Sequence, residues 1–177
     1  MSLSDRWIDF ICTRAKSSKT RTLLRPAGAI LYWVILGLFI FASLWMDKFF
    51  GLPNPFPPLL TIVVSVPIFA LGFSLPLWSV IYFIKTRGLS VLFNPPSKLI
   101  TVGPYAYSRN PMVAGIIMLL LGLGVLFGST SLIFVLAPFF FLLNVLELRV
   151  IEEPELEKRF GNEYLEYKKR VPRFFLK

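Results

Sequence analysis

The residues best placed to do chemistry lie in two polar stretches of an otherwise apolar chain. The first, residues 98–112, reads K-L-I-T-V-G-P-Y-A-Y-S-R-N-P-M. Proline disfavours helical conformation in the residue before it, so Asn110 is predicted to be non-helical and Pro111 to begin the next helix. We therefore expect a loop at the membrane surface, although a simple turn between two spans has the same composition. Its candidate functional side chains are Tyr105, Tyr107 and Arg109.

The second polar stretch, residues 147–173, follows the last apolar segment and reads E-L-R-V-I-E-E-P-E-L-E-K-R-F-G-N-E-Y-L-E-Y-K-K-R-V-P-R. Adjacent carboxylates beside a membrane, Glu152 and Glu153, are costly unless a cation lies near them. They could also be a charge pair that stabilises a helix N-terminus ahead of Pro154. Arg149 could likewise serve a site or simply reach out to water.

The composition limits which kinds of chemistry are available. The chain has 177 residues, no histidine and one cysteine, Cys12. Without histidine the commonest general base and metal ligand is absent, so Ser–His–Asp and Cys–His catalysis are excluded and no metal site is expected. A single cysteine also excludes an intramolecular disulfide.

The apolar residues and the charges are arranged as in a membrane protein. Hydrophobic residues make up 55% of the chain and occur in long runs, and the formal net charge is +9. The positive charges flank the apolar runs, which predicts contact with anionic lipid headgroups rather than with nucleic acid.

The apolar runs predict an all-α integral membrane protein with four transmembrane helices, at residues 26–46, 59–84, 111–127 and 131–148. Only three residues separate the last two, which predicts a tight helical hairpin. Residues 1–25 are predicted to form an interfacial amphipathic helix followed by a basic tether. Residues 154–170 are predicted to form a cytosolic amphipathic helix, whose apolar stripe comprises Leu156, Phe160, Tyr164 and Tyr167.

The distribution of lysine and arginine predicts the orientation of the chain. They number six in residues 1–26, one in 47–58, four in 85–110, none in 128–130 and eight in 147–177. Positively charged segments stay in the cytoplasm, so both termini and both polar stretches are predicted to face it.

The two polar stretches together resemble a known family. The motifs G-P-Y-A-Y-S-R-N-P and E-E-P-E-L…F-G-N-E-Y-L-E-Y-K-K-R-V-P-R are similar to those of the isoprenylcysteine carboxyl methyltransferases and their phospholipid N-methyltransferase relatives. The resemblance covers roughly residues 93–173. It departs from the family at Asn110, where many members have histidine, and at Val113, where an aromatic residue is common.

The resemblance implies a methyltransferase core over residues 85–177, preceded by two transmembrane helices over residues 26–84, with S-adenosylmethionine as cofactor. Arg109 suits this cofactor because its planar guanidinium can pair with a carboxylate, and aromatic faces such as those of Tyr105 and Tyr107 suit a sulfonium cation. The expected cofactor-binding residues are Ser97, Lys98, Leu99, Ile100, Tyr105, Arg109, Asn110 and Glu152. The expected catalytic residues are Arg149, which would face the substrate, and Glu153.

The reaction predicted from these residues is methylation of the carboxylate of an isoprenylcysteine-type lipid. A carboxylate is already ionised at neutral pH and needs alignment rather than a base, which fits a chain without histidine. The alternative is N-methylation of an aminophospholipid, for which Glu153 could accept the proton. A non-catalytic membrane scaffold is the hypothesis from another class of protein.

Overall fold

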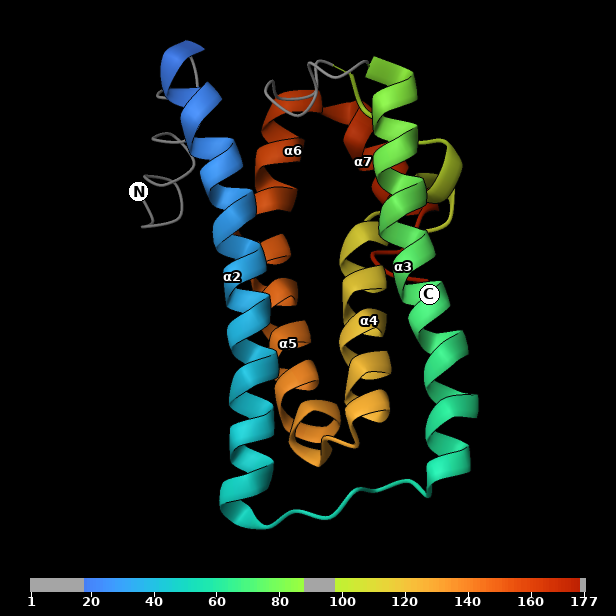
Figure 1. Ribbon diagram of the computed structural model, residues 1–177. Helices are drawn as coiled ribbons and strands as arrows, with labels where there is room; N and C mark the ends of the chain where they lie inside the picture. The colour runs from blue at the N-terminus through green and yellow to red at the C-terminus, as the bar shows by residue number, and fades with distance from the viewer. Residues whose placement is uncertain (1–17, 88–97, 176–177) are drawn as a thin grey trace.

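The computed structural model describes residues 18–87 and 98–175, which are helical apart from short connections and contain no β-strand (Figure 1). The helices are α2 (Ser18–Phe50), α3 (Pro58–Arg87), α4 (Pro111–Phe127), α5 (Ala137–Glu147), α6 (Glu153–Phe160) and α7 (Asn162–Arg170). A 3₁₀ turn spans Gly103–Ala106, and π-helical segments span Leu132–Leu136 and Leu148–Glu152. Most of the predicted interfacial helix lies outside the described residues, and residues 18–25 belong to α2.

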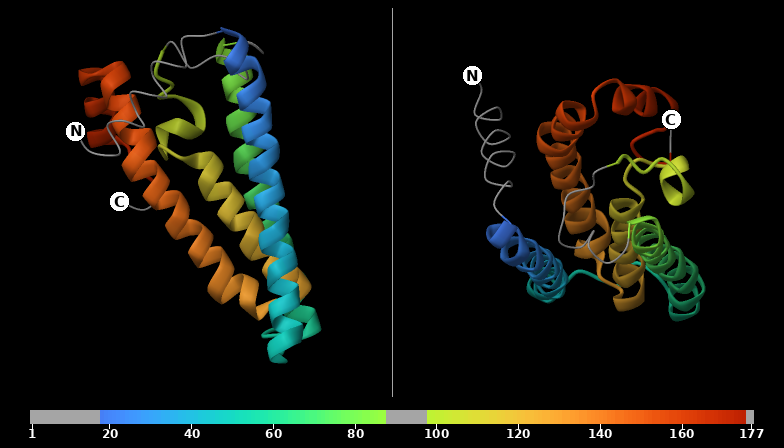
Figure 2. Two further views of the ribbon diagram at one scale, coloured as in Figure 1. Left: turned by 90° about the vertical axis from the view of Figure 1, so that its left-hand side faces the viewer. Right: turned by 90° about the horizontal axis from the view of Figure 1, so that it is seen from above.

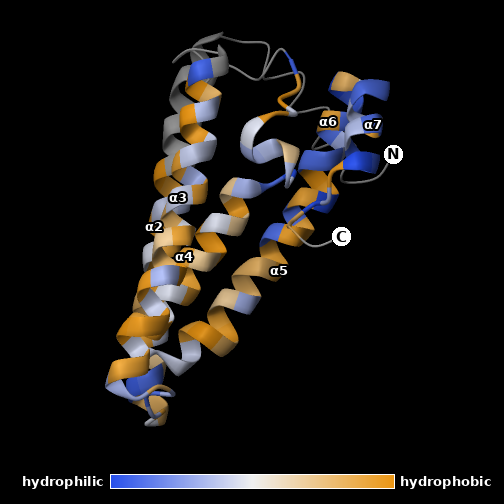
Figure 3. Cartoon of the chain, turned by 90° about the vertical axis from the view of Figure 1, so that its right-hand side faces the viewer, coloured by the Kyte–Doolittle hydropathy of each residue, from blue (hydrophilic) through white to orange (hydrophobic). Residues whose placement is uncertain are grey.

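Three described helices are long and apolar enough to cross a membrane, over Ile30–Phe50, Pro58–Lys85 and Leu132–Phe160. The fourth apolar helix, α4, is shorter, with 17 residues. Large hydrophobic side chains on α2 and α3, such as those of Phe41 and Leu59, are exposed on the outside of the bundle. Such surfaces suit contact with lipid, so the chain is an integral membrane protein. Figure 3 shows hydrophobic residues along these helices and hydrophilic ones around α6 and α7.

The predicted hairpin between the last two apolar helices is present. The α4 helix ends at Gly128, which has φ of +62° and donates its N–H to the carbonyl oxygens of Gly124 and Val125. Asp47, near the end of α2, binds the turn by accepting hydrogen bonds from the Ser131 N–H at 2.8 Å and from the Ser129 hydroxyl. These bonds supply an N-terminal cap for the returning helix and join it to α2.

Close contact between α3 and α4 depends on glycine. A Cβ at Gly72 would lie 2.5 Å from Leu119 N, and a Cβ at Gly115 would overlap the Pro76 ring. The two backbones therefore approach as closely as small residues allow in membrane helix pairs. Pro67 and Pro76 lie inside α3, which continues through both.

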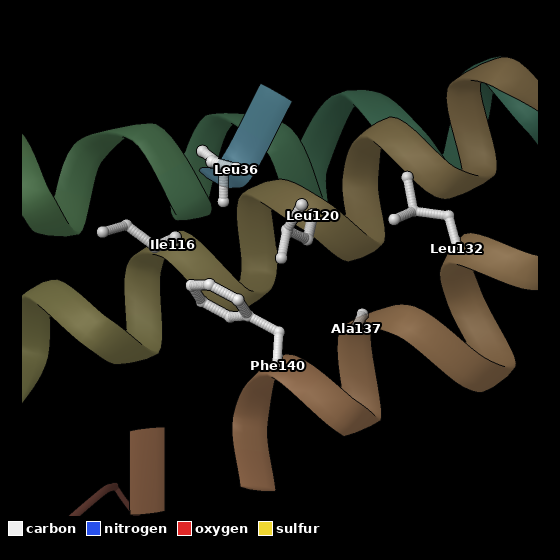
Figure 4. Close-up of a cluster of buried hydrophobic side chains, with 6 residues drawn as sticks. All are labelled: Leu36, Ile116, Leu120, Leu132, Ala137 and Phe140. Carbon is white, nitrogen blue, oxygen red and sulfur yellow. The ribbon is translucent and has the colours of Figure 1, made fainter. Parts of the chain in front are cut away.

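A small hydrophobic core joins α2, α4 and the returning helix (Figure 4). Leu120 and Leu132 are fully buried, and Phe140 packs towards Ile116 and Leu36. This core lies between the hairpin turn and the end of the bundle that carries α6 and α7, and it fixes α2 against the hairpin.

The C-terminal helices differ from the prediction of one separate surface helix beginning at Pro154. The helix that begins at Leu132 continues without a break to Phe160, because Pro154 follows a π-helical segment that absorbs the irregularity. It breaks instead at Gly161, which has φ of +54° and ψ of −128°, a conformation that favours glycine. Figure 2 shows α7 turning from α6 back towards the 3₁₀ turn.

Candidate functional site

The two polar stretches meet at one end of the bundle, where the chain after α7 runs beside residues 108–110 (Figure 2). The N–H of Arg109 donates to the carbonyl oxygen of Pro172 at 2.9 Å. The Ser108 hydroxyl and the Asn110 amide both donate to the carbonyl oxygen of Arg173, at 3.1 and 3.2 Å. These contacts hold the loop between α3 and α4 against the C-terminal segment.

A buried carboxylate, that of Glu153, connects the same two segments. Its oxygens lie 2.8 Å from Arg109 Nη1, 2.8 Å from Arg173 Nε and 3.1 Å from Lys168 Nζ. The Glu153 side chain is 7% exposed and that of Arg109 is 9% exposed. Lys168 also contacts Glu157, so three cations face two carboxylates and the cluster keeps one surplus positive charge.

The aromatic stripe of the C-terminal helices packs inward onto the loop. Tyr164, Tyr167 and Val171 are buried together, with Leu99 packed against them. The Tyr167 hydroxyl donates to the carbonyl oxygen of Tyr105 at 2.7 Å. Burial, together with the nearby Glu152 carboxylate, raises the pKa of Tyr105, so its phenol stays protonated at physiological pH.

These contacts enclose a narrow cavity of about 110 Å³ between the loop and the C-terminal helices. The loop contributes Lys98, Leu99 and Ile100, and the helices contribute an aromatic and aliphatic wall. The full lining comprises Phe83, Lys98, Leu99, Ile100, Tyr105, Arg109, Asn110, Leu148, Glu152, Glu153, Leu156, Phe160, Tyr164 and Tyr167.

A wider cavity of about 700 Å³ lies between α2, α4 and α5 and is lined mainly by apolar side chains. Among its aromatic members, Phe140 contacts Tyr32 and Phe39 edge to face, with ring centres 5.9 Å apart for Tyr32 and 5.6 Å apart for Phe39. Its polar members are Tyr32, Tyr105, Arg109, Asn110, Asn144, Glu147 and Glu152.

The two cavities adjoin, because five residues line both of them: Phe83, Tyr105, Arg109, Asn110 and Glu152. Glu152 differs from the others in its charge environment. Three further carboxylates, those of Glu147, Glu153 and Glu155, interact with it electrostatically. Within the described ranges, Glu152 has no ion pair with a lysine or arginine. The junction of the cavities therefore holds a carboxyl group without a cation partner among the described residues.

The π-helical segment explains why Glu152 faces this junction. In a regular α-helix, residues five apart point about 140° away from each other. In Leu148–Glu152 the helix makes wider turns, and the N–H of Glu153 bonds to the carbonyl oxygen of Leu148, five residues earlier. Residues five apart therefore share a face, and both Glu147 and Glu152 line the wide cavity.

Most of the residues predicted from the sequence come together at these cavities. Ser97 lies outside the described residues. Arg149 is exposed and lines neither cavity, and Tyr107 is 64% exposed and also lies outside both. Glu153 reaches the narrow cavity, but its oxygens are bound by three cations, which makes it a poor proton acceptor. The predicted residues that line a cavity are Lys98, Leu99, Ile100, Tyr105, Arg109, Asn110, Glu152 and Glu153.

Several lining residues were not predicted as part of a site. We recognised the stripe of Leu156, Phe160, Tyr164 and Tyr167 only as the apolar face of a helix. Because such a face must be buried, it could have been predicted to pack against the loop. Arg173 belongs to the V-P-R motif, but its pairing with Glu153 depends on the chain turning back after α7. No local signal marks Phe83 or Tyr32, which come from α3 and α2.

Comparison with known proteins identifies the family. The phospholipid methyltransferase family model matches residues 60–163, which is more than half of the chain and extends from α3 into α7. The matched part contains the loop, the hairpin and Glu152, and it excludes α2. Neither the curated proteins nor the solved structures contain a significant match to the chain.

Proposed function

Because the chain belongs to the phospholipid methyltransferase family, we propose that it transfers the methyl group of S-adenosylmethionine to the amine of a membrane lipid. In this proposal the cofactor binds in the narrow cavity and reaches the junction, and the lipid occupies the wide, apolar cavity. Membership of the family makes the chain a membrane methyltransferase for lipid-like substrates. S-adenosylmethionine as the cofactor and an amine as the methyl acceptor are our proposal.

The observation that carries the proposal is the position of Glu152. Its carboxylate lines both cavities at their junction and has no cation partner among the described residues. A carboxylate that is partly removed from water is costly without a neighbouring positive charge. A sulfonium cation on one side and a lipid ammonium on the other would each supply such a charge at the place where the methyl group must move.

The other groups of the narrow cavity fit the remaining parts of the cofactor. Leu99 and Ile100 offer apolar surface to a purine ring. Arg109 belongs to the cluster with one surplus positive charge, which suits a carboxylate. The faces of Phe83 and Tyr105, whose rings meet edge to face with centres 5.3 Å apart, suit a sulfonium. When bound, S-adenosylmethionine supplies an electrophilic methyl group.

The charges of the wide cavity favour an amine over a carboxylate as the acceptor. Glu147 and Glu152 both line this cavity. Among the described residues that line it, the basic one is Arg109, which is already paired with Glu153. The arginine predicted to face a substrate carboxylate, Arg149, is exposed outside the cavity. A carboxylate substrate would therefore meet net negative charge, whereas an ammonium would be attracted.

The proposed reaction is a direct displacement in which the residues position the partners and accept a proton. A new bond forms between the lipid nitrogen and the methyl carbon while the bond between that carbon and sulfur breaks, and sulfur keeps the electron pair. The ammonium must lose a proton, and Glu152 is the carboxylate placed to accept it and pass it to water. The apolar walls exclude water, and the adjoining cavities supply proximity.

Carboxyl methylation of an isoprenylcysteine-type lipid is the second candidate. The C-terminal motif, which resembles that of the isoprenylcysteine carboxyl methyltransferases, supports it, and Arg109 lines the wide cavity and could contact a substrate carboxylate.

Purified protein in lipid nanodiscs distinguishes the two candidates. The protein is incubated with S-adenosylmethionine carrying a labelled methyl group, and the nanodiscs contain either phosphatidylethanolamine or a prenylcysteine. We expect label on the lipid nitrogen, identified by mass spectrometry. Label on the prenylcysteine carboxylate alone would contradict the proposal and support the second candidate.

A further inference from the structure

We propose that Tyr32, Asn144 and Glu147 form the subsite that holds the ammonium group of the lipid substrate. This inference rests on the proposed function and adds the residues that select the acceptor. Tyr32 comes from α2, which lies outside the residues matched by the family model. This part of the proposed subsite therefore comes from a helix that the family model does not cover.

The hydroxyl of Tyr32 is a polar group that lacks a partner. It is buried and makes no hydrogen bond to any described residue, although Tyr32 lines the wide cavity. A buried hydroxyl without a partner costs on the order of 1–3 kcal/mol, so such a group is expected to serve a ligand or a structural water. It lies near enough to Glu147 to interact with that carboxylate.

Asn144 and Glu147, which both lie on α5, add two more hydrogen-bond acceptors. The Asn144 amide donates from Nδ2 to the carbonyl oxygen of Phe140 at 2.7 Å, which leaves its Oδ1 as an acceptor. Glu147 follows three residues later, close to one turn of the helix, and lines the same cavity. The described side chains at this place therefore offer oxygen acceptors and no basic group beyond the paired Arg109.

The arrangement is matched to an unmethylated amine. A primary ammonium has three N–H donors, and the subsite provides three acceptor groups, one of them charged. Phe140, in edge-to-face contact with Tyr32, contributes to holding the phenol in place. Each methylation removes one N–H donor from the lipid, so the subsite favours the unmethylated lipid over its methylated products.

The test compares the wild type with Tyr32→Phe, Asn144→Leu and Glu147→Gln in nanodiscs. The substrate is unmethylated phosphatidylethanolamine, and the trimethylated lipid phosphatidylcholine is added as a competitor. Tyr32→Phe removes one hydrogen bond to a charged group, so KM for the unmethylated lipid should rise about tenfold. Inhibition by the trimethylated lipid, which has no N–H, should change little. The affinity for S-adenosylmethionine, measured by calorimetry, should also be unchanged.

Matched controls separate this effect from a general loss of structure. Tyr107→Phe and Glu163→Gln change exposed side chains outside both cavities and should leave KM as in the wild type. If the wild type methylates lipid amines but Tyr32→Phe and Glu147→Gln match it on both lipids, the subsite is disproved and the proposed function stands. If the wild type methylates no lipid amine, both proposals are overturned.

Discussion

The Arg109 guanidinium and the Glu153 carboxylate, 44 positions apart in the sequence, form a buried ion pair with Nη1 and Oε1 2.8 Å apart. The pair joins the loop before α4 to the helix that leaves α5. It therefore holds together the two segments that enclose the narrow cavity, and it depends on the neighbouring Lys168 and Arg173 contacts to the same carboxylate.

Replacing Glu153 with glutamine should destabilise the protein. The change leaves two arginines and a lysine without their shared carboxylate, and removing one partner of a buried ion pair costs about 3 kcal/mol. Thermal unfolding in detergent should show a clear drop in Tm. Glu155→Gln is the matched control, because its pair with Arg159 is partly exposed and should contribute less than about 1 kcal/mol. Equal effects of the two variants would contradict a structural role for Glu153.

Replacing Gly72 with alanine should loosen the contact between α3 and α4. The added Cβ would lie 2.5 Å from Leu119 N and 2.9 Å from Met118 C, both of which are backbone atoms that cannot move without shifting the helix. Overpacking of this kind costs about 1–3 kcal/mol, which thermal unfolding would detect. Gly37→Ala is the control, since nothing lies within 4 Å of its added Cβ, and it should be neutral or mildly stabilising.

Replacing Val113 with tryptophan should narrow the cavity proposed for the lipid. Val113 lies on α4 and, of the two cavities, lines only the wide one. We expect KM for a two-chain lipid amine to rise about tenfold, with less effect on a single-chain analogue, while the affinity for S-adenosylmethionine stays constant. Val135→Trp adds the same bulk on an exposed face away from both cavities. Equal kinetics for the two variants would show that the wide cavity does not bind the lipid.

The sequence allowed prediction of the features that depend on local signals. Runs of apolar residues located the four apolar helices, and the Asn110-Pro111 pair located the start of α4. The loop residues of the first polar stretch and Glu152 of the second were assigned to one site because their motifs resemble those of a family. Residues of both stretches line the narrow cavity.

The features that were missed depend on the course of the backbone over longer distances. The π-helical segment Leu148–Glu152 has no sequence signature that distinguishes it from an α-helix, yet it decides that Glu152 faces the junction and that Arg149 is exposed. The distinct surroundings of Glu153 arise because the chain turns back after α7 and brings Arg173 to it. Tyr32 reaches the wide cavity only because α2 packs beside the hairpin.

In the proposed site, Glu152 supplies the negative charge for a sulfonium at the junction of the two cavities. Calorimetric titration of the wild type, Glu152→Gln and the exposed control Glu163→Gln tests this, with S-adenosylmethionine and with its product S-adenosylhomocysteine, which lacks the sulfonium charge, as ligands. We expect Glu152→Gln to weaken binding of S-adenosylmethionine at least about tenfold and to leave binding of S-adenosylhomocysteine nearly unchanged. Equal affinity of the wild type and Glu152→Gln for S-adenosylmethionine, or no binding by the wild type, would contradict it.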